Sequence, residues 1–377
     1  MLTSTRLHDL SRELESILAL TVYGSSRYED PATRREWRLA LDLELQRIAQ
    51  ALEGAPHRER EDFARAAGHL EDLLAGHRFP TAARGWLAVA TAERIELAEP
   101  FAVDIPVEAR WGRGMLVAPS VRVLGKRGAA IVAVVDGRSG RLYRYEDDIV
   151  RELESFTALA VSRPAYHMSA PPRRGFHRGT RGTTGRDAAE RDRRAARARM
   201  IRQIVGRLTT IAVAGERLLL GGMSQMAIAI RDALPADLAA RAAVIELDVH
   251  ASEADLRRSA GRALAEVLRS DLAAWVDSLV ATWTDAGRAA VGIPASLQRL
   301  AERSVARLVV TEHLLREHPE DAERAVWLAL EQGADLDYAT DAAAARLDRV
   351  GEGIGVALRF VAMAPPSPTV ASAATPA

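Results

Sequence analysis

The stretch AAIVAVVDGRSGRLYRY, residues 129–145, decides how the middle of this 377-residue chain folds. Its first seven residues are apolar and rich in β-branched side chains, and residues 141–145 form a second strand candidate. Asp136-Gly-Arg-Ser-Gly140 lies between them and is a glycine-rich turn. Two strands joined by such a turn predict a β-hairpin, and a third strand is expected over residues 149–159.

The residues that follow add a parallel layer to this hairpin. Residues 217–220 and 243–248 have the apolar character of strands, and residues 225–234 between them have helical spacing. Strand, helix and strand in this order imply a parallel α/β layer. Gly221-Gly-Met-Ser-Gln225 joins the first of these strands to the helix. Although it holds two glycines and a glutamine, a tight strand-to-helix turn is favoured over a functional role for Gln225.

The two ends of the chain also mix helices with strands. Before the hairpin, the pattern predicts a helix over 7–17, a strand over 18–23, a helix opened by Asp30-Pro31, a helix over 58–74, and strands over 86–90, 94–97 and 103–109. After the parallel layer it predicts helices over 253–289, 297–304 and 320–332, and strands over 305–311 and 351–360.

These patterns predict the α/β class, in an α+β multi-domain arrangement. We expect an N-terminal mixed α/β domain over 1–120, a middle domain over 121–252 and a C-terminal α/β sandwich over 253–364. Residues 162–187 interrupt the middle domain with prolines and glycines and have no apolar periodicity, which is typical of a functional loop or a linker. Residues 365–377 have the composition of a disordered tail.

Charge is distributed unevenly along the chain. The 51 basic and 51 acidic residues cancel, yet residues 163–207 hold thirteen Arg and three acids, a net charge of +10, so the rest carries −10. A basic stretch on an acidic protein indicates a polyanionic partner. Only Lys126 is a lysine, so Arg is the default base here, and its presence alone does not indicate phosphate recognition.

Several kinds of chemistry are excluded or disfavoured by the sequence. The chain has no cysteine, which excludes disulfides, thiolate metal sites and a cysteine nucleophile. Gly125-Lys126 lacks the surrounding residues of a phosphate-binding loop. His313 and His318 are too far apart around a helix to share a metal readily. No apolar run is long enough to span a bilayer and no secretory signal is evident, so we expect a cytoplasmic protein. From the missing motifs we expect no metal and no cofactor.

Three features in one order carry a family resemblance. A basic glycine-rich loop leads into an Arg-rich helix expected over 188–205, Leu218-Leu-Leu-Gly-Gly222 follows, and the last domain closes with Gly351-Glu-Gly-Ile-Gly-Val-Ala-Leu-Arg-Phe360. Over roughly residues 15–362 the chain resembles the bacterial archaeo-eukaryotic release factor superfamily, and most of all its family 10. The resemblance implies a bacterial protein with an RNase H-like middle domain, a C-terminal α/β/α sandwich resembling kink-turn-binding ribosomal proteins, and the ribosome as a partner.

The resemblance also implies what the loop does. In that superfamily a Gly-Gly-Gln tip enters the peptidyl transferase centre of the large subunit. Here the loop has glycines and cations but no glutamine. Backbone N–H groups could face an oxyanion and threonines could hold a water, so the catalytic candidates are Gly182, Thr183, Thr184 and Gly185. The RNA-binding candidates are Arg173, Arg174, His177, Arg178, Arg181, Arg186, Arg191 and Arg194.

Two functions from different classes follow. The first is a ribosome-associated release or rescue-type factor that binds rRNA or peptidyl-tRNA. Its first domain lacks the Asn-Ile-Lys-Ser motif of stop-codon readers, so codon-independent rescue fits better than programmed termination, and peptidyl-tRNA hydrolysis stays open. The alternative is a non-catalytic module that keeps the fold and binds a protein or another RNA. Neither DNA nor a membrane is expected as a partner, and the sequence leaves the oligomeric state open.

Overall fold

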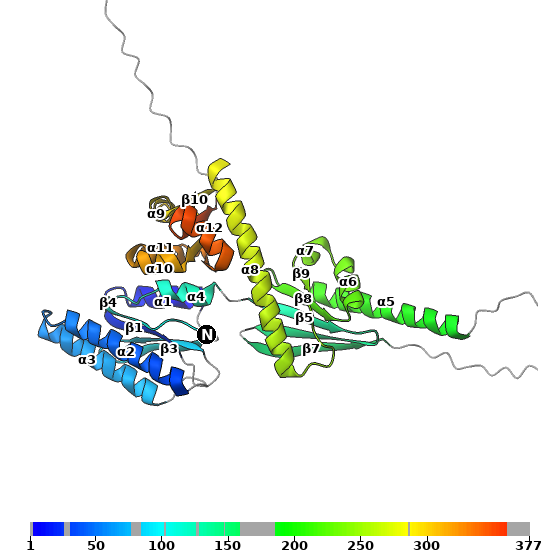
Figure 1. Ribbon diagram of the computed structural model, residues 1–377, viewed down its shortest axis with the longest axis horizontal. Coiled ribbons are helices and arrows are strands. Elements are labelled where there is room, and N and C mark those ends of the chain that lie inside the picture. The colour runs from blue at the N-terminus through cyan, green and yellow to red at the C-terminus, as the bar shows by residue number, and fades with distance from the viewer. Residues whose placement is uncertain are drawn as a thin grey trace, which may run out of the picture. The chain divides into compact units, whose positions relative to one another are not determined.

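The structure, a computed structural model, describes residues 3–25, 31–76, 84–101, 103–125, 128–146, 148–158, 185–285 and 287–359. The chain forms two compact units (Figure 1). Unit 1 comprises Met1–Arg127 and Arg269–Ala377, and unit 2 comprises Gly128–Leu268. Each unit is described by itself below. The three-domain division at residues 120 and 252 stays a prediction.

The N-terminal part of unit 1 is a four-stranded antiparallel sheet in the order β3-β2-β1-β4. Its strands are β1 (Leu18–Ser25), β2 (Gly85–Ala90), β3 (Ile95–Phe101) and β4 (Glu108–Arg113). Helices α2 (Pro31–Ala51) and α3 (His57–Ala75) bury Leu41, Ile48, Phe63 and Leu70 against one face of it. These helices are confirmed, whereas the strand expected over 103–109 lies at 108–113, where it pairs with β1.

The C-terminal part of unit 1 is a second sheet, in the order β10-β13-β11-β12. Its strands are β10 (Ala289–Val291), β11 (Val305–Thr311), β12 (Asp335–Ala339) and β13 (Ile354–Leu358), and only β11 and β12 run parallel. The helices of this part are α9 (Ile293–Ala301), α10 (Glu312–Glu317), α11 (Pro319–Glu331) and α12 (Asp341–Gly351). Apolar cores lie on both faces of this sheet. The α/β sandwich expected over residues 253–364 stays a prediction.

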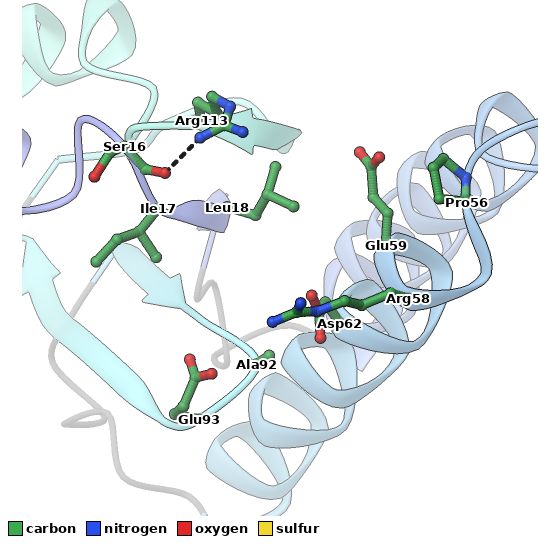
Figure 2. Close-up of a pocket in the computed structure, with 10 residues that line it drawn as sticks. All are labelled: Ser16, Ile17, Leu18, Pro56, Arg58, Glu59, Asp62, Ala92, Glu93 and Arg113. Atoms are coloured by element: carbon green, nitrogen blue, oxygen red, sulfur yellow. Dashed lines mark hydrogen bonds between the residues drawn. The ribbon is translucent and has the colours of Figure 1, made fainter.

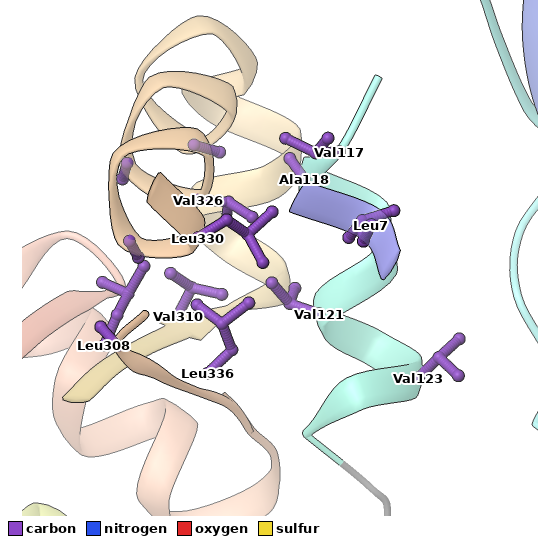
Figure 3. Close-up of a cluster of buried hydrophobic side chains, with 14 of the residues drawn as sticks. Leu7, Val117, Ala118, Val121, Val123, Leu308, Val310, Val326, Leu330 and Leu336 are labelled. Carbon is purple, nitrogen blue, oxygen red and sulfur yellow. The ribbon is translucent and has the colours of Figure 1, made fainter. Parts of the chain in front are cut away.

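The two parts of unit 1 share one core. Helix α1 (Ser4–Glu13), the 3₁₀ turn η1 (Ala118–Ser120) and helix α4 (Val121–Leu124) bury Leu7, Ala118 and Val121 in the same cluster as Val326 of α11 and Val310 of β11 (Figure 3). Burial of so many aliphatic side chains is the main term that stabilises this unit.

A buried ion-pair network lies beside that core. The Arg122 side chain is 4% exposed; its Nε lies 2.9 Å from Glu312 Oε2 and its NH1 lies 2.7 Å from Glu108 Oε1. Tyr338 donates its hydroxyl proton to Glu312 at 2.8 Å. Burial alone raises the pKa of both carboxyl groups, but the hydrogen bonds from Arg122 and Tyr338 hold the pKa of Glu312 below its ordinary value, whereas that of Glu108 stays raised.

Unit 2 is built on a five-stranded mixed sheet in the order β7-β6-β5-β8-β9. Its strands are β5 (Ala130–Val135), β6 (Ser139–Glu146), β7 (Ile149–Thr157), β8 (Arg217–Gly222) and β9 (Ala242–Val244). The hairpin is confirmed, because β5, β6 and β7 are successive antiparallel neighbours, and so is the parallel layer of β5, β8 and β9. The strand expected over 243–248 is shorter than predicted.

Helices cover both faces of this sheet. Helices α5 (Gly185–Ile211), α6 (Ser224–Ala233) and α7 (Ala236–Ala239) lie on one face, and Met200, Ile204 and Ile230 are buried there against Ile131. The first half of α8 (Glu253–Asp285) buries Leu256 and other residues on the opposite face. Within the part of the chain that the structure describes, no helix is long and apolar enough to cross a membrane.

Candidate nucleic-acid interface

The turns at one edge of the unit 2 sheet meet where the basic loop begins. Val135 of β5 pairs with Gly222 of β8, and the Met223 N–H donates to the Val135 carbonyl oxygen at 2.7 Å. Ala158, the last described residue before the loop, donates its N–H to the Arg138 carbonyl oxygen at 2.7 Å. We call residues 136–139, 157–158 and 222–225 the loop edge. Ala158 therefore lies beside the hairpin turn, and the turn after β8 lies beside the end of β5.

The hairpin turn at the loop edge is held by its own aspartate. Asp136 Oδ1 accepts the backbone N–H groups of Arg138 at 2.5 Å and Ser139 at 2.6 Å. Partial burial raises the pKa of Asp136, but these hydrogen bonds outweigh it and leave the pKa below its ordinary value. The carboxylate is thus engaged by the turn, and it leaves the Arg138 side chain exposed at the tip.

The glycine pair between β8 and α6 is required by the turn that it makes. Gly222 has a φ of 94°, and a Cβ there would collide with the carbonyl oxygen of Val135. A Cβ on Gly221 would press on the Leu247 side chain. The interpretation of these glycines as a tight strand-to-helix turn is confirmed. Gln225 lies exposed in the first turn of α6, next to the 45% exposed Met223.

Helix α5 has two different halves. Ala196, Met200, Ile204 and Leu208 repeat every four residues and form its buried stripe against the sheet. Residues 190–195, in contrast, are all exposed, and Figure 1 shows this end of the helix running on past the strands. We call residues 185–195 the α5 overhang. At 1.5 Å per residue it is about 16 Å long.

The arginines of α5 divide by what they contact. Arg207 Nε lies 2.6 Å from Glu154 Oε2 on β7, and Arg197 donates to the Gly137 carbonyl oxygen at 3.3 Å, so these two tie the helix to the sheet. Arg194 pairs with Glu190 one turn away. Arg193 and Arg202 are exposed, and among the described residues the structure records no partner for either. These two guanidinium groups are available to a ligand.

Helix α5 carries a net positive charge that is uneven along its length. It has eight Arg and three acidic residues, a net charge of +5. All three acids fall in the overhang together with four of the Arg, so the overhang carries +1 and residues 196–211 carry +4. The positive end of the helix dipole and these arginines together attract anions such as nucleic-acid phosphates.

Most of the predicted site residues fall outside the described part of the chain. These are Arg173, Arg174, His177, Arg178, Arg181, Gly182, Thr183 and Thr184. Gly185 and Arg186 begin α5, and Arg191 and Arg194 lie exposed on the overhang, so the structure brings these four onto one helix end. Their roles stay predictions.

The structure shows three more exposed arginines on this surface that were not among the RNA-binding candidates: Arg138, Arg193 and Arg202. Arg193 and Arg202 belong to the same basic run, which was a signal for them. Arg138 had no such signal, because only the strand pairing brings its turn to the start of the loop. Within the described ranges, no cluster of three or more histidine or acidic side chains could hold a metal ion.

Comparison with protein families supports the resemblance. Residues 116–269 match the model of bacterial archaeo-eukaryotic release factor family 10. The matched segment contains all of unit 2, including the loop edge and α5. The family resemblance is therefore confirmed over this segment.

None of the curated proteins matches the chain. Among solved structures, it is similar to an archaeal translation termination factor, aRF1, with 15% identity over 95% of this chain and 99% of that chain and a TM-score of 0.26. Archaeoglobus fulgidus Pelota gives 16% identity over 75% and 81%, with a TM-score of 0.37. A model of ribosome-bound archaeal Pelota and ABCE1 gives 13% identity over 74% and 78%, with a TM-score of 0.40. At such low scores the likeness carries no argument about function.

Proposed function

We propose that this protein is a release-factor-like protein that associates with the ribosome and binds rRNA or tRNA through the loop edge and the α5 overhang. The observation that carries the proposal is the family match over residues 116–269, which coincides with the unit that holds the Arg-rich helix. Arginine recognises phosphate through its planar fork of donors, and the available Arg193 and Arg202 supply such donors.

The basic loop extends this surface toward the tRNA. The described residues that flank the loop are Ala158 at the loop edge and Gly185 at the start of α5, so contacts of the overhang with RNA would also hold one of these two flanking positions. In this proposal the loop approaches the peptidyl transferase centre of the large subunit. The N–H groups of residues 182–185 face the developing oxyanion of the ester, and Thr183 or Thr184 holds the attacking water. Hydrolysis takes place without stop-codon reading, as ribosome rescue requires.

Co-sedimentation with large subunits across a salt series tests the binding step. Two variants remove cations from the interface: Arg178, Arg181 and Arg186 to Ala, and Arg193 and Arg202 to Ala. A matched control removes three exposed arginines of unit 1 (Arg12, Arg60 and Arg349) for which the structure records no ion pair with another described residue. Wild-type binding should weaken with salt, and each lost phosphate contact should lower the slope of log affinity against log salt by about 1. Interface variants that bind like the control would overturn the assigned surface.

Peptide release tests the catalytic step separately. Stalled ribosomes that carry labelled peptidyl-tRNA are mixed with the protein in excess, and the freed peptide is measured. Release that is lost in Thr183→Ala, Thr184→Ala protein with binding unchanged supports hydrolysis by the loop. Intact peptidyl-tRNA at saturating protein contradicts it.

A second candidate function is a non-catalytic interaction module that keeps the release-factor fold. Two observations favour it: the loop lacks the glutamine of the family motif, and the chain outside residues 163–207 carries a net charge of −10. It predicts a protein or non-ribosomal RNA partner. A pull-down from lysate that recovers ribosomal components alone would count against it.

A further inference from the structure

A cavity of about 470 Å³ lies in unit 1, far along the chain from the basic loop. It is formed by the end of α1, the end of β4 with the turn after it, and the start of α11. Its lining residues are Ser11, Glu15, Arg110, Arg113, Gly114, Met115, Leu116, Pro319, Glu320, Glu323, Arg324 and Trp327. The volume is in the range of small-molecule sites.

Three arginines line this cavity with donors that the protein uses poorly. Arg110 Nε is buried, and the structure shows no hydrogen-bond partner for it among the described residues. The other Arg110 contacts are long: NH1 lies 3.8 Å from Glu323 Oε1, and NH2 lies 3.4 Å from the Gly114 carbonyl oxygen. Arg113 donates one N–H to Ser16, and exposed Arg324 has no ion pair recorded within the described ranges. The buried Arg110 Nε costs free energy that an anionic ligand would recover, and the exposed Arg113 and Arg324 add cations beside it.

Three carboxylates, Glu15, Glu320 and Glu323, equal the three arginines in number but differ in what they contact. Glu323 accepts the backbone N–H groups of Val117 at 2.9 Å and Ala118 at 2.8 Å, so its oxygens are already engaged. Glu15 and Glu320 are exposed residues of the lining, and the described structure records no ion pair for either. Such carboxylates can accept hydrogen bonds from hydroxyl groups of a ligand.

The remaining wall is apolar and includes an aromatic ring. Trp327 is partly buried and packs against the core of unit 1, while Met115, Leu116 and Pro319 complete the surface. An indole held by the core offers a rigid face for stacking of a planar ring. The cavity therefore combines guanidinium donors, an aromatic face and hydroxyl acceptors.

A second cavity of unit 1 lacks this combination. It measures about 310 Å³ and is shown in Figure 2, where Arg113 donates to the Ser16 carbonyl oxygen at 2.7 Å and Arg58 reaches in from α3. Three acids, Glu59, Asp62 and Glu93, outnumber its two arginines, and none of its lining residues is aromatic. It offers an anion little net attraction and a planar ring no partner.

We propose that the larger cavity binds a single phosphate-bearing nucleotide. Arg110, Arg113 and Arg324 hold the phosphate, the base lies against Trp327, and a sugar hydroxyl donates to Glu15 or Glu320. This site is separate from the RNA surface of unit 2, and the proposal does not rest on ribosome binding. The nucleotide comes either free or as the 5′ end of an RNA strand, since both present the same phosphate, sugar and base.

Isothermal titration calorimetry on the full chain tests the proposal. The titrants are adenosine 5′-monophosphate, adenosine, inorganic phosphate and a short RNA with a 5′-phosphate. We expect the mononucleotide to bind at least about tenfold tighter than adenosine or phosphate alone, because only it engages both the arginines and the ring. Mononucleotide and RNA binding that are both weakened by Arg324→Ala indicate a strand end, and an effect on the mononucleotide alone indicates a free nucleotide. No binding of either, or binding no tighter than that of phosphate, overturns the proposal.

Two variants and a control locate the binding. Arg324→Ala removes an exposed cation from the cavity and should weaken mononucleotide binding by about tenfold or more. Arg349→Ala removes another exposed arginine, from α12, and should leave binding unchanged. Trp327→Phe should weaken binding less than Arg324→Ala does. If the Phe variant fails to fold, Arg324→Ala still decides, since wild-type affinity in that variant contradicts the site.

Discussion

Arg122 of unit 1 and Arg193 of unit 2 are both arginines, but they differ in burial and in ion pairing. The Arg122 side chain is 4% exposed and contacts two carboxylates, whereas Arg193 stands exposed on the α5 overhang with no partner recorded among the described residues. In a chain whose bases are all Arg except for Lys126, residue type says little about role. Burial and pairing separate arginines that stabilise the fold from arginines that are available to a ligand.

Replacement of Arg122 should give the largest effect. Arg122→Ala leaves Glu108 and Glu312 without their shared cation, and loss of one partner from a buried network costs about 3–5 kcal/mol of unfolding free energy. Urea denaturation followed by tryptophan fluorescence measures it, with Arg193→Ala as the matched arginine. We expect that control to stay within about 0.5 kcal/mol of wild type. Equal stability of the two variants would break the distinction between these arginines.

Gly222→Ala should give the next largest loss of stability. It tests whether the turn at the loop edge tolerates substitution as poorly as the Arg122 network of unit 1. Its φ of 94° disfavours alanine, and the new Cβ would meet the carbonyl oxygen of Val135, so we expect a loss of about 3 kcal/mol. Gly215→Ala is the control: its φ is 86°, but nothing lies within 4 Å of the added Cβ, so a loss of about 1 kcal/mol is expected. Similar losses at both glycines would show that the close approach to β5 is unimportant.

The arginines of α5 provide a smaller and purely local contrast. Arg207→Ala breaks a half-exposed pair with Glu154 and should cost less than about 1 kcal/mol of unfolding free energy. Arg202→Ala should cost nothing measurable, yet it should lower the salt slope of ribosome binding by about 1. Urea denaturation of the two variants measures the change in stability, and their co-sedimentation with large subunits measures the change in salt slope. Loss of stability in Arg202→Ala with unchanged binding would reverse the assignment.

The sequence predicts those elements whose pattern is complete within a few residues. The hairpin of β5 and β6, strand β11 and the Arg-rich α5 are found because apolar runs, turn glycines and helical spacing are local signals. Strand β12 was not predicted, since Asp335 and Asp337 interrupt its apolar pattern. Asp337 pairs with Arg307 of the neighbouring strand, and no local pattern shows that pairing.

The candidate site divides in the same way. The basic stretch is visible in the sequence as a run of arginines, so its position on one helix could be predicted. The sequence does not show which of these arginines form contacts within the protein. Arg207 contacts Glu154 and Arg197 contacts Gly137, and each partner is more than fifty residues away in the chain. Arg138 and the unit 1 cavity depend on chain segments that only the fold brings together.

The smallest effect concerns how stability depends on pH, and it returns to the buried carboxylates of unit 1. Burial raises the pKa of Glu323 above its ordinary value of 4.5, in spite of Arg110 and the backbone N–H groups of Val117 and Ala118. A raised pKa in the folded state means that the folded protein holds this proton more tightly, so its contribution is lost as the pH rises above 4.5 through the folded pKa. Glu312 has a lowered pKa, so its contribution to stability is lost as the pH falls below 4.5 through the folded pKa.

Glu323→Gln isolates that contribution, because Glu323 Oε2 alone accepts from Val117 at 3.1 Å and from Ala118 at 2.8 Å. The single amide oxygen of glutamine can take that place and has no charge to bury. Urea denaturation of both proteins from pH 4.5 to neutrality should show the wild type losing more stability than the variant as the pH rises. Parallel curves would mean that the carboxylate is solvated enough to ionise without cost. Glu323 would then be a hydrated carboxylate in the cavity that Arg110 lines. The difference in burial between the charged groups of unit 1 and those of the α5 overhang would be smaller than the structure indicates.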